Sequence, residues 1–259
     1  MNPDPARAAP LSPVAPPSAG APLSPDVTPP PLPPLGPAGP AQAARLRPIR
    51  TYVPRFRTTA RTRGRLDALL PRYGVRALPL VPAEAFGRVA PLVVEIGSGY
   101  GEAALGYAAA HPEHDVLAAE IHLPGVATML AAADAAEINN LRVYPDDGLN
   151  LLNGGLPAGA AHAIHLFFPD PWPKSKHAKR RLVQRHTLVA LARLLAPGGR
   201  LLVASDHPTY AAHVRAQFAG HAGFVVVEIE RPSWKSLDGF EAKGLAAGRA
   251  ITYLAATPR

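Results

Sequence analysis

The sequence predicts an α/β fold, in which a doubly wound parallel sheet carries helices on both faces and follows a disordered, proline-rich tail. From about residue 91 to the C-terminus, short apolar runs alternate with segments of helical spacing. This alternation is typical of a parallel sheet covered by helices. Several of the apolar runs end at glycine or at acidic residues, at the sheet edge where ligands of such folds bind.

The first 43 residues differ in composition from the rest of the chain. Sixteen of the 32 prolines fall within the first 50 residues, with alanine, serine and glycine between them and almost no charge. Proline lacks a backbone donor and disfavours helix and strand alike, so this stretch cannot form a packed unit. We expect a disordered, partly polyproline tail at residues 1–43 and one folded domain at residues 44–259.

The sequence of residues 44–259 predicts strands and helices in alternation. Pro124 suits the first turn of a helix, and Pro197-Gly198-Gly199 ends another. The apolar runs predict strands at residues 92–96, 115–120, 141–144, 162–168, 200–204, 224–230 and 250–256. Helical spacing predicts helices at residues 103–110, 124–137, 181–195 and 208–218.

Basic residues concentrate in two stretches. Residues 45–65 hold eight arginines and no acid, and residues 174–185 hold six further cations, again without an acid. These stretches contain 14 of the 27 basic residues, so the other 13 face all 19 acidic ones. Two basic stretches on an otherwise acidic protein favour contacts with nucleic-acid phosphates over a merely solvated surface.

Several classes of protein are excluded or disfavoured. The absence of cysteine excludes disulfides and thiolate metal sites, and the ten histidines show no ligand spacing, so we expect no metal. No run approaches the roughly 18 apolar residues of a membrane span, and the N-terminus lacks the features of a secretion signal. No GxSxG elbow and no P-loop is present. We expect a cytoplasmic protein that does not bind membranes.

A glycine-rich turn follows the first predicted strand. Glu95 ends the strand, and Gly97, Gly99 and Gly101 follow with GxGxG spacing, which lets the backbone approach a ligand closely. Dinucleotide-binding proteins use a different spacing, and Glu95 would repel a pyrophosphate. It would attract the sulfonium and ammonium groups of S-adenosylmethionine. Glu120 ends the second strand, where an acid can bind ribose hydroxyls. The alternative is an ordinary tight turn with solvated acids.

Two later strands also end at carboxylates. Asp147, in the pair Asp146-Asp147 after the third strand, is placed to meet an adenine at the carboxyl edge of the sheet. Asp170 follows the fourth strand, and its neighbours Pro169 and Pro171 restrict its conformation. A preorganised site requires such a restriction.

An aromatic ring and a dense run of cations follow Asp170. Trp172 can stack on a base, and the cations from Lys174 to Arg181 can hold the phosphates on either side of it. The alternative is a proline-rich turn with a buried tryptophan and a solvated, basic start of a helix.

These motifs together resemble those of the bacterial tRNA (guanine-N7-)-methyltransferase family. That family carries an E-I-G-x-G-x-G cofactor loop, an acid that closes the second strand, and an F-P-D-P-W-x-K segment followed by H-x-K-R-R. Here they correspond to residues 95–101, to Glu120, to residues 168–174 and to residues 177–181. The resemblance covers residues 45–259 and leaves out the tail.

The resemblance implies a seven-stranded, Rossmann-like methyltransferase fold that uses S-adenosylmethionine to methylate N7 of the variable-loop guanine of tRNA. The cofactor site would consist of Glu95, Gly97, Gly99, Gly101, Glu120, Asp147 and Asp170, with Asp170 also the catalytic residue. The residues that contact tRNA would be Lys174, Asp206, Asp238, Phe240 and Glu241. The last three match the family's T-x-[FY]-E motif, except that Asp238 stands in place of threonine.

The chemistry of the base agrees with this interpretation. Guanine N7 carries a lone pair and no proton at neutral pH, so the enzyme has to align N7 with the methyl group rather than supply a base. The alternatives are another S-adenosylmethionine-dependent RNA methyltransferase and a non-catalytic RNA-binding module on the same fold. The glycine spacing and Glu95 disfavour a nucleotide-dependent dehydrogenase. A monomer and a homodimer are both compatible with the sequence.

Overall fold

The structure, a computed structural model, describes residues 58–75, 77–221, 223–237 and 239–259. The predictions for the tail at residues 1–43, for the five arginines from Arg45 to Arg57 and for Asp238 lie outside the described residues. All other predicted site residues are described.

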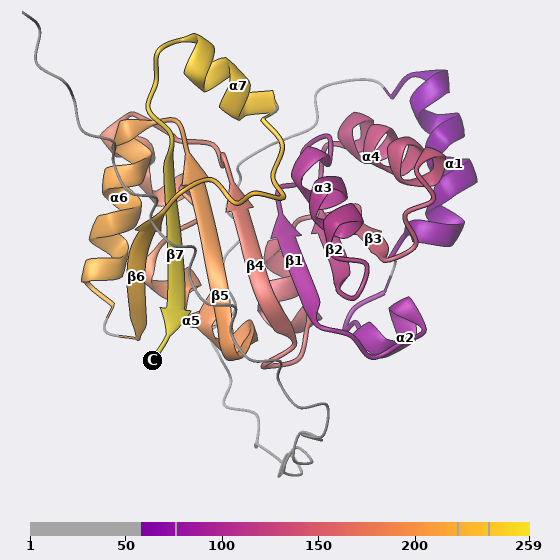
Figure 1. Cartoon of the computed structure of the whole chain (residues 1–259), viewed down its shortest axis with the longest axis horizontal. Coiled ribbons are helices and arrows are strands. Elements are labelled where there is room, and N and C mark those ends of the chain that lie inside the picture. The colour runs from indigo at the N-terminus through magenta and orange to yellow at the C-terminus, as the bar shows by residue number, and fades with distance from the viewer. Residues whose placement is uncertain (1–57, 76, 222, 238) are drawn as a thin grey trace, which may run out of the picture. The chain divides into compact units, whose positions relative to one another are not determined.

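The described residues form one seven-stranded sheet with the order β3-β2-β1-β4-β5-β7-β6 (Figure 1). The strands are β1 (Leu92–Ile96), β2 (Asp115–Ala119), β3 (Leu141–Tyr144), β4 (Ala161–Phe167), β5 (Leu195–Ser205), β6 (Phe224–Ile229) and β7 (Thr252–Pro258). All seven predicted strands are confirmed. Strand β7 pairs antiparallel with both neighbours, whereas the other pairs are parallel. The exception arises because a helix at the carboxyl edge connects β6 to β7, so that β7 runs back from that edge.

Helices cover both faces of the sheet, as predicted. Helices α1, α3 and α4 lie together on one side of Figure 1 and share one apolar core, while α5 and α6 pack on a second core. The helices are α1 (Ala60–Tyr73), α2 (Pro82–Phe86), α3 (Glu102–Ala110), α4 (Leu123–Ala135), α5 (Arg185–Leu194), α6 (Pro208–Ala219) and α7 (Gly239–Ala246), with short helical segments η1 (Leu151–Gly155) and η2 (Ser175–Arg180).

Strand β1 shows how the sequence creates these two cores. Successive side chains of a strand point to opposite faces. Leu92 and Val94 therefore belong to the core under α5 and α6, and Val93 belongs to the core under α3 and α4. Glu95 lies on the same face as Val93, and Ile96 on the opposite one.

Two boundaries differ from the prediction by four residues or more. The helix predicted at residues 181–195 begins at Arg185, because Gln184 caps it: the Gln184 N–H donates to the hydroxyl of Thr187 at 2.8 Å. The strand predicted from residue 200 begins at Leu195, and the Pro-Gly-Gly sequence forms an irregularity inside it instead of a separating loop. Helices α1, α2 and α7 were not predicted.

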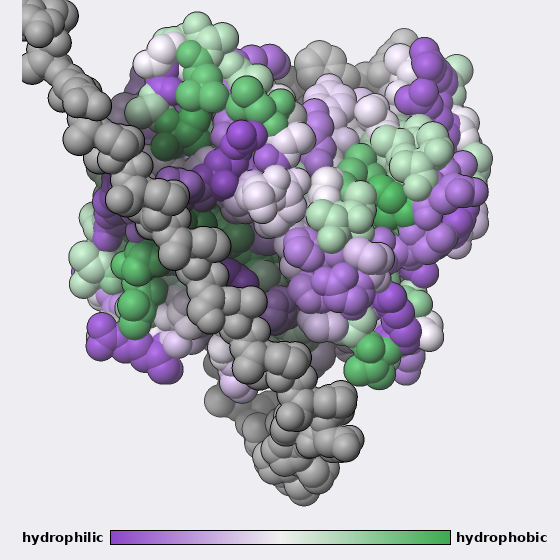
Figure 2. All heavy atoms as spheres, in the orientation of Figure 1, coloured by the Kyte–Doolittle hydropathy of each residue, from purple (hydrophilic) through white to green (hydrophobic). Residues whose placement is uncertain are grey.

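The surface of the domain is uneven in character. Figure 2 shows apolar side chains gathered over α7, where Leu237, Phe240 and Leu245 are largely exposed, and hydrophilic ones over α1. Among the described residues, no helix has the length and apolar character needed to cross a bilayer.

Candidate active site

The turn between β1 and α3 depends on its glycines. Gly97, Gly99 and Gly101 have φ values of 76°, 59° and 88°, which favour glycine. A Cβ at Gly101 would lie 2.3 Å from Cγ of Met129, and one at Gly125 would lie 2.3 Å from the carbonyl oxygen of Gly99. Helix α4 therefore packs so closely on this turn that no side chain fits at Gly101 or Gly125, whereas at Gly97 and Gly99 the backbone angle alone favours glycine.

Glu120, directly after β2, holds the same turn. One carboxylate oxygen accepts a hydrogen bond from the Gly99 N–H at 2.6 Å, and the other accepts from the His122 N–H at 2.7 Å. Each oxygen of a carboxylate has a second lone pair. Glu120 can therefore bind the turn and a ligand hydroxyl at the same time.

Glu95, the fourth residue of β1, lies on the face of the sheet that α3 covers. It is 2% exposed, and its Oε2 lies 3.7 Å from Nδ1 of His165. Burial lowers the pKa of His165 to about 3, so this imidazole is neutral at neutral pH. The ring of His165 stacks on Trp234 with the centroids 5.2 Å apart. Glu95 thus has a neutral, aromatic surrounding on this side and is not among the residues that line the cavity described below.

Asp146 and Asp147 follow β3. Asp147 Oδ1 accepts from the Leu149 N–H at 2.9 Å, and Asp146 Oδ1 accepts from the Asp147 N–H at 2.7 Å. Burial raises the pKa of Asp147, and the hydrogen bond from Leu149 partly offsets this. The pair is thus held by backbone donors at the sheet edge where the sequence predicts it.

Asp170 lies in a loop with a constrained backbone. Phe168 and Trp172, on either side of it, have positive φ values of 49° and 41°, which cost a non-glycine residue about 1–3 kcal/mol each. Buried Arg181 holds this conformation, because its guanidinium donates to the carbonyls of Pro171 at 3.1 Å and Trp172 at 2.9 Å. Partial desolvation raises the pKa of Asp170.

The basic stretch after Asp170 contains both buried and exposed cations. The expectation that the whole stretch faces a nucleic acid is wrong for Arg181, which is buried in the contacts just described. Lys174 and Arg180 are exposed. The Arg180 guanidinium lies 4.8 Å from the Trp172 ring centroid, and His177 meets the same ring edge-on at 5.6 Å. The indole face that was expected to stack on a base is therefore in contact with Arg180.

Five of the seven predicted cofactor residues, Gly97, Gly99, Glu120, Asp147 and Asp170, line a cavity of about 360 Å³ at the carboxyl ends of β1 to β4, whereas Glu95 and Gly101 do not. Four carboxylates line it, from Glu120, Asp146, Asp147 and Asp170, and Gly97 and Gly99 contribute backbone. Its volume suits a small organic ligand. The rest of the lining consists of Ile96, Ala119, Ile121, His122, Gly148, Leu149, Phe168, Pro169, Arg180, Leu182 and Phe240. The arrangement favours a ligand with positive charge and apolar parts.

Helix α7 brings an exposed aromatic ring to the rim of this cavity. Phe240 is 63% exposed and lines the cavity. Glu241, the next residue, is 2% exposed, and its Oε2 accepts from Lys235 Nζ at 2.9 Å and from the Tyr253 hydroxyl at 2.7 Å. Arg231 Nε lies 3.7 Å from Oε1 of the same carboxylate. Glu241 is thus turned into the protein, where it anchors the helix.

Asp206 provides a second anchor for α7. Its Oδ2 accepts from Arg249 Nε at 2.9 Å, and a terminal nitrogen of the same guanidinium lies 2.8 Å away. A Cβ at Gly244 would lie 2.8 Å from Cβ of Asp206, so the helix rests directly on this residue. Neither Asp206 nor Lys174 lines the cavity.

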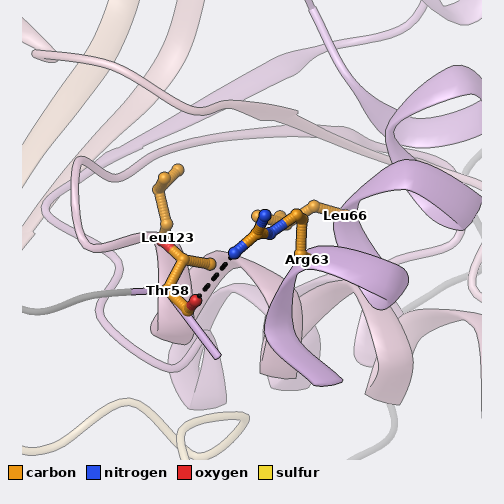
Figure 3. Close-up of a pocket in the computed structure, with 4 residues that line it drawn as sticks. All are labelled: Thr58, Arg63, Leu66 and Leu123. Carbon is orange, nitrogen blue, oxygen red and sulfur yellow. Dashed lines mark hydrogen bonds between the residues drawn. The ribbon is translucent and has the colours of Figure 1, made fainter. Parts of the chain in front are cut away.

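A second hollow, of about 590 Å³, lies beside the N-terminus of α1 (Figure 3). Leu66 and Leu123 form its apolar walls, and the side chain of Arg63 extends across it to donate to the Thr58 carbonyl at 3.3 Å. Leu123 directly follows His122, which lines the first cavity. The basic helix α1 is therefore a neighbour of the acid-lined cavity.

Two important residues escaped sequence reasoning. His122 contributes to the cavity and caps α4, since its Nδ1 accepts from the Gly125 N–H at 3.2 Å. Its position two residues after Glu120 was an available signal. Lys235 is a single lysine in a loop, and no sequence pattern distinguishes it from a solvated one.

Fold and site together define a methyltransferase with a Rossmann-like sheet. Residues 89–253 match the model of a family described as putative methyltransferase. A solved structure titled as an antibiotic related methyltransferase has the same fold, with a TM-score of 0.50, 14% identity, and coverage of 71% of this chain and 97% of that one.

Closer relatives narrow the assignment. The chain is 38% identical to the tRNA (guanine-N(7)-)-methyltransferase of Nitrosomonas europaea over 79% of this chain and 94% of the relative. It is 41% identical to the protein of that name from Chromohalobacter salexigens over 79% of this chain and 87% of the relative. The chain belongs to the tRNA (guanine-N(7)-)-methyltransferase family, as its motifs indicated.

Proposed function

We propose that this protein transfers the methyl group of S-adenosylmethionine to N7 of a guanine in tRNA, that the target is the variable-loop guanine, and that the reaction takes place in the cytoplasm. One observation carries the proposal. This protein belongs to the family, and its acid-lined cavity, Asp170 and the exposed ring of Phe240 all lie at the same edge of the sheet. The cavity accommodates the methyl donor, and the rim receives the base.

The residues of the cavity fit S-adenosylmethionine. When bound, this cofactor supplies an electrophilic methyl group on a positively charged sulfur, and carboxylates around the cavity favour that charge. Glu120 would accept hydrogen bonds from the ribose hydroxyls through its remaining lone pairs, and Asp147 would accept one from the adenine amino group. Gly97 and Gly99 allow the ligand to approach the backbone.

Glu95 and Gly101 contribute to the same site from behind the turn. The carboxylate of Glu95 is buried, so solvent would screen its charge little and the carboxylate would attract the ammonium of the cofactor. Gly101 starts α3 in a conformation and a space that exclude a side chain. It thereby sets the shape of the turn.

Asp170 orients the guanine. A carboxylate in this loop can accept hydrogen bonds from N1–H and from the exocyclic amine of guanine, which turns N7 toward the methyl group. The negative charge also stabilises the purine as it becomes cationic in the transition state. Because N7 has no proton to lose, alignment is the main task of the site.

Two basic surfaces border this site and form the proposed tRNA contacts. Arg61 and Arg63 on α1 are exposed, and among the described residues no carboxylate lies within 4.0 Å of their guanidinium groups. Lys174 and Arg180 lie on the other side, next to the Asp170 loop. Phe240 offers a face on which an unstacked base can pack, as in other proteins that recognise single-stranded RNA.

Asp206 and Glu241, two residues implied to contact tRNA, act indirectly in this proposal. Both carboxylates are occupied by cations of the protein itself, Arg249 and Lys235 respectively. The pair of Glu241 with Lys235 fixes the start of α7, and the pair of Asp206 with Arg249 fixes the segment that follows it. Helix α7 carries Phe240. We therefore assign Asp206 and Glu241 as positioning residues.

The test is methylation of unmodified tRNA with labelled S-adenosylmethionine, followed by nucleoside analysis. The expected product is 7-methylguanosine, and the Asp170→Asn variant serves as the matched control of low activity. A tRNA whose variable-loop guanine is replaced by adenine should accept no label. Label in a different nucleoside would identify another RNA methyltransferase, and label in the altered tRNA would disprove the variable-loop assignment.

A further inference from the structure

Three potential metal ligands converge in the turn between α3 and β2. His111, Glu113 and His114 each offer one ligand atom, and these atoms lie within 4.8 Å of one another; Glu113 Oε1 faces Nδ1 of His111 and Nε2 of His114. The carboxylate oxygen is 3.3 Å from the first nitrogen and 3.8 Å from the second. Ligands of a tetrahedral zinc ion, with bonds of 2.0–2.1 Å, lie about 3.3–3.4 Å apart. The donors therefore need to close by about 1.5 Å at most to hold such an ion.

The turn that carries these ligands is held by its backbone. Asn140 Nδ2 donates to the carbonyls of His111 at 3.1 Å and His114 at 2.9 Å. Arg88 donates to the His114 carbonyl at 3.0 Å, and its own charge is compensated by Asp115 at 2.7 Å. These contacts hold the backbone that carries the two imidazoles before any ion arrives, which lowers the cost of binding.

Neighbouring side chains supply the outer contacts that a metal site needs. The Tyr107 hydroxyl lies 2.7 Å from Nδ1 of His114. A proton on Nδ1, donated to this hydroxyl, leaves the lone pair of Nε2 free for an ion, as outer hydrogen bonds do in established sites. His162, the second residue of β4, has its ring centroid 5.1 Å from that of His114 and is within reach of a fourth position.

We propose that His111, Glu113 and His114 bind a divalent transition-metal ion of the zinc class, with His162 as the fourth ligand. Two or three imidazoles with one carboxylate suit zinc, cobalt or nickel rather than magnesium or calcium. The ion would tie the turn before β2 to the start of β4. Both lie at the amino edge of the parallel strands, opposite the cavity, so the site is independent of methyl transfer.

The probe is Co²⁺ added to the metal-free, full-length protein without a histidine tag. We expect saturable one-to-one binding with the visible absorption of a tetrahedral or five-coordinate site, displaced by Zn²⁺, and a rise in Tm on addition of either ion. His111→Ala and His114→Ala should each lower the affinity at least about tenfold, the loss seen even for outer contacts of metal sites. His162→Ala should lower it as well.

Glu113→Gln is a second test in case the histidine variants fail to fold. Glu113 is largely exposed, so this variant should fold, and it should also bind Co²⁺ more weakly. His186→Ala, an exposed histidine on α5, is the matched control and should bind as wild type. Absorption that does not saturate, or that persists in the His111→Ala/His114→Ala double variant, would overturn the site. The affinity for S-adenosylmethionine should be the same with and without the ion, and a dependence on it would contradict the independence of the two sites.

Discussion

The buried ion pair beneath α7 allows the strongest test of the positioning role assigned to Glu241. The side chains of Lys235 and Glu241 are 1% and 3% exposed, and Nζ lies 2.9 Å from Oε2. Lys235→Met keeps most of the aliphatic stem and removes the charge. Glu241 then retains the hydroxyl of Tyr253 and the guanidinium of Arg231, 3.7 Å away.

The magnitude of the effect follows from the burial of the pair. Removal of one partner of a buried ion pair costs about 3–5 kcal/mol. Arg231 lies 3.7 Å from the same carboxylate and compensates its charge in part. We therefore expect Lys235→Met to lower the free energy of unfolding by about 2–3.5 kcal/mol at pH 7.

Urea unfolding at pH 7 measures the stability, and steady-state methylation measures the consequence for α7. A displaced Phe240 should raise KM for tRNA and lower kcat/KM, by up to about 100-fold for a shift near 1 Å. The affinity for S-adenosylmethionine should change far less. Lys235→Met combined with Glu241→Leu should recover much of the stability, since an apolar pair leaves no charge behind.

Arg215→Met is the matched control. Arg215 pairs with Glu228 on the surface, where both side chains are about half exposed, and such pairs contribute about 0–1 kcal/mol. If Lys235→Met destabilises the protein no more than this control does, the pair does not hold α7. An equal loss of affinity for cofactor and tRNA would likewise refute a role confined to α7.

Three further changes to the protein have expected results. Asp170→Asn should slow single-turnover methylation about 10- to 150-fold, the value of one charge-assisted hydrogen bond, with tRNA affinity nearly intact; a rate within about threefold of wild type would show that the role is wrong. Desolvation raises the pKa of Asp170, so the acid limb of the wild-type pH–rate profile should lie above the usual aspartate range and be absent from the Asn variant. Because the pKa of Asp170 is raised in the folded state, ionisation of this carboxyl lowers the free energy of unfolding as pH rises through that pKa. Asp170→Asn, which carries no such charge, should therefore be at least as heat-stable as wild type at neutral pH. Arg61→Gln, Arg63→Gln and Arg65→Gln together should raise KM for tRNA and flatten its salt dependence by about 0.7–0.9 for each phosphate that is no longer neutralised, whereas an unchanged slope would mean that α1 is merely solvated. Deletion of residues 1–43 should leave kcat/KM within about tenfold of wild type, about 1.4 kcal/mol, and a larger decrease would give the tail a part in catalysis.

The parts of the fold that sequence reasoning predicted are those with a strong local signal. The parallel strands are buried on both faces, so they appear as continuous apolar runs, and β1 to β4 were found with boundaries within one residue. Once the strands are known, the carboxyl edge follows, and with it the neighbourhood of Glu120, Asp147 and Asp170. Their common cavity was therefore accessible to sequence alone.

The parts that were missed depend on contacts distant in sequence. Helix α1 is polar on most of its surface and buries only Leu66 and Tyr73, so its period is weak, and α7 is short. Arg181 stands in a run of cations that all look solvated, yet its guanidinium is taken by two carbonyls of the loop beside it. Glu241 belongs to a motif associated with the substrate, and its partner Lys235 is visible only in three dimensions. Composition and spacing carry no information about which charges are paired.

The structure of the site favours a rigid arrangement of its residues over acid–base chemistry. Phe168 and Trp172 hold unfavourable backbone conformations, and Asp170 between them is partly desolvated. These costs persist because Arg181 fixes the loop from within and Glu120 fixes the facing turn through two backbone N–H groups. N7 of guanine needs no base, so a rate advantage must come from holding the base and the methyl group in line. A rigid loop opposite a rigid turn is suited to this alignment of N7 with the methyl group.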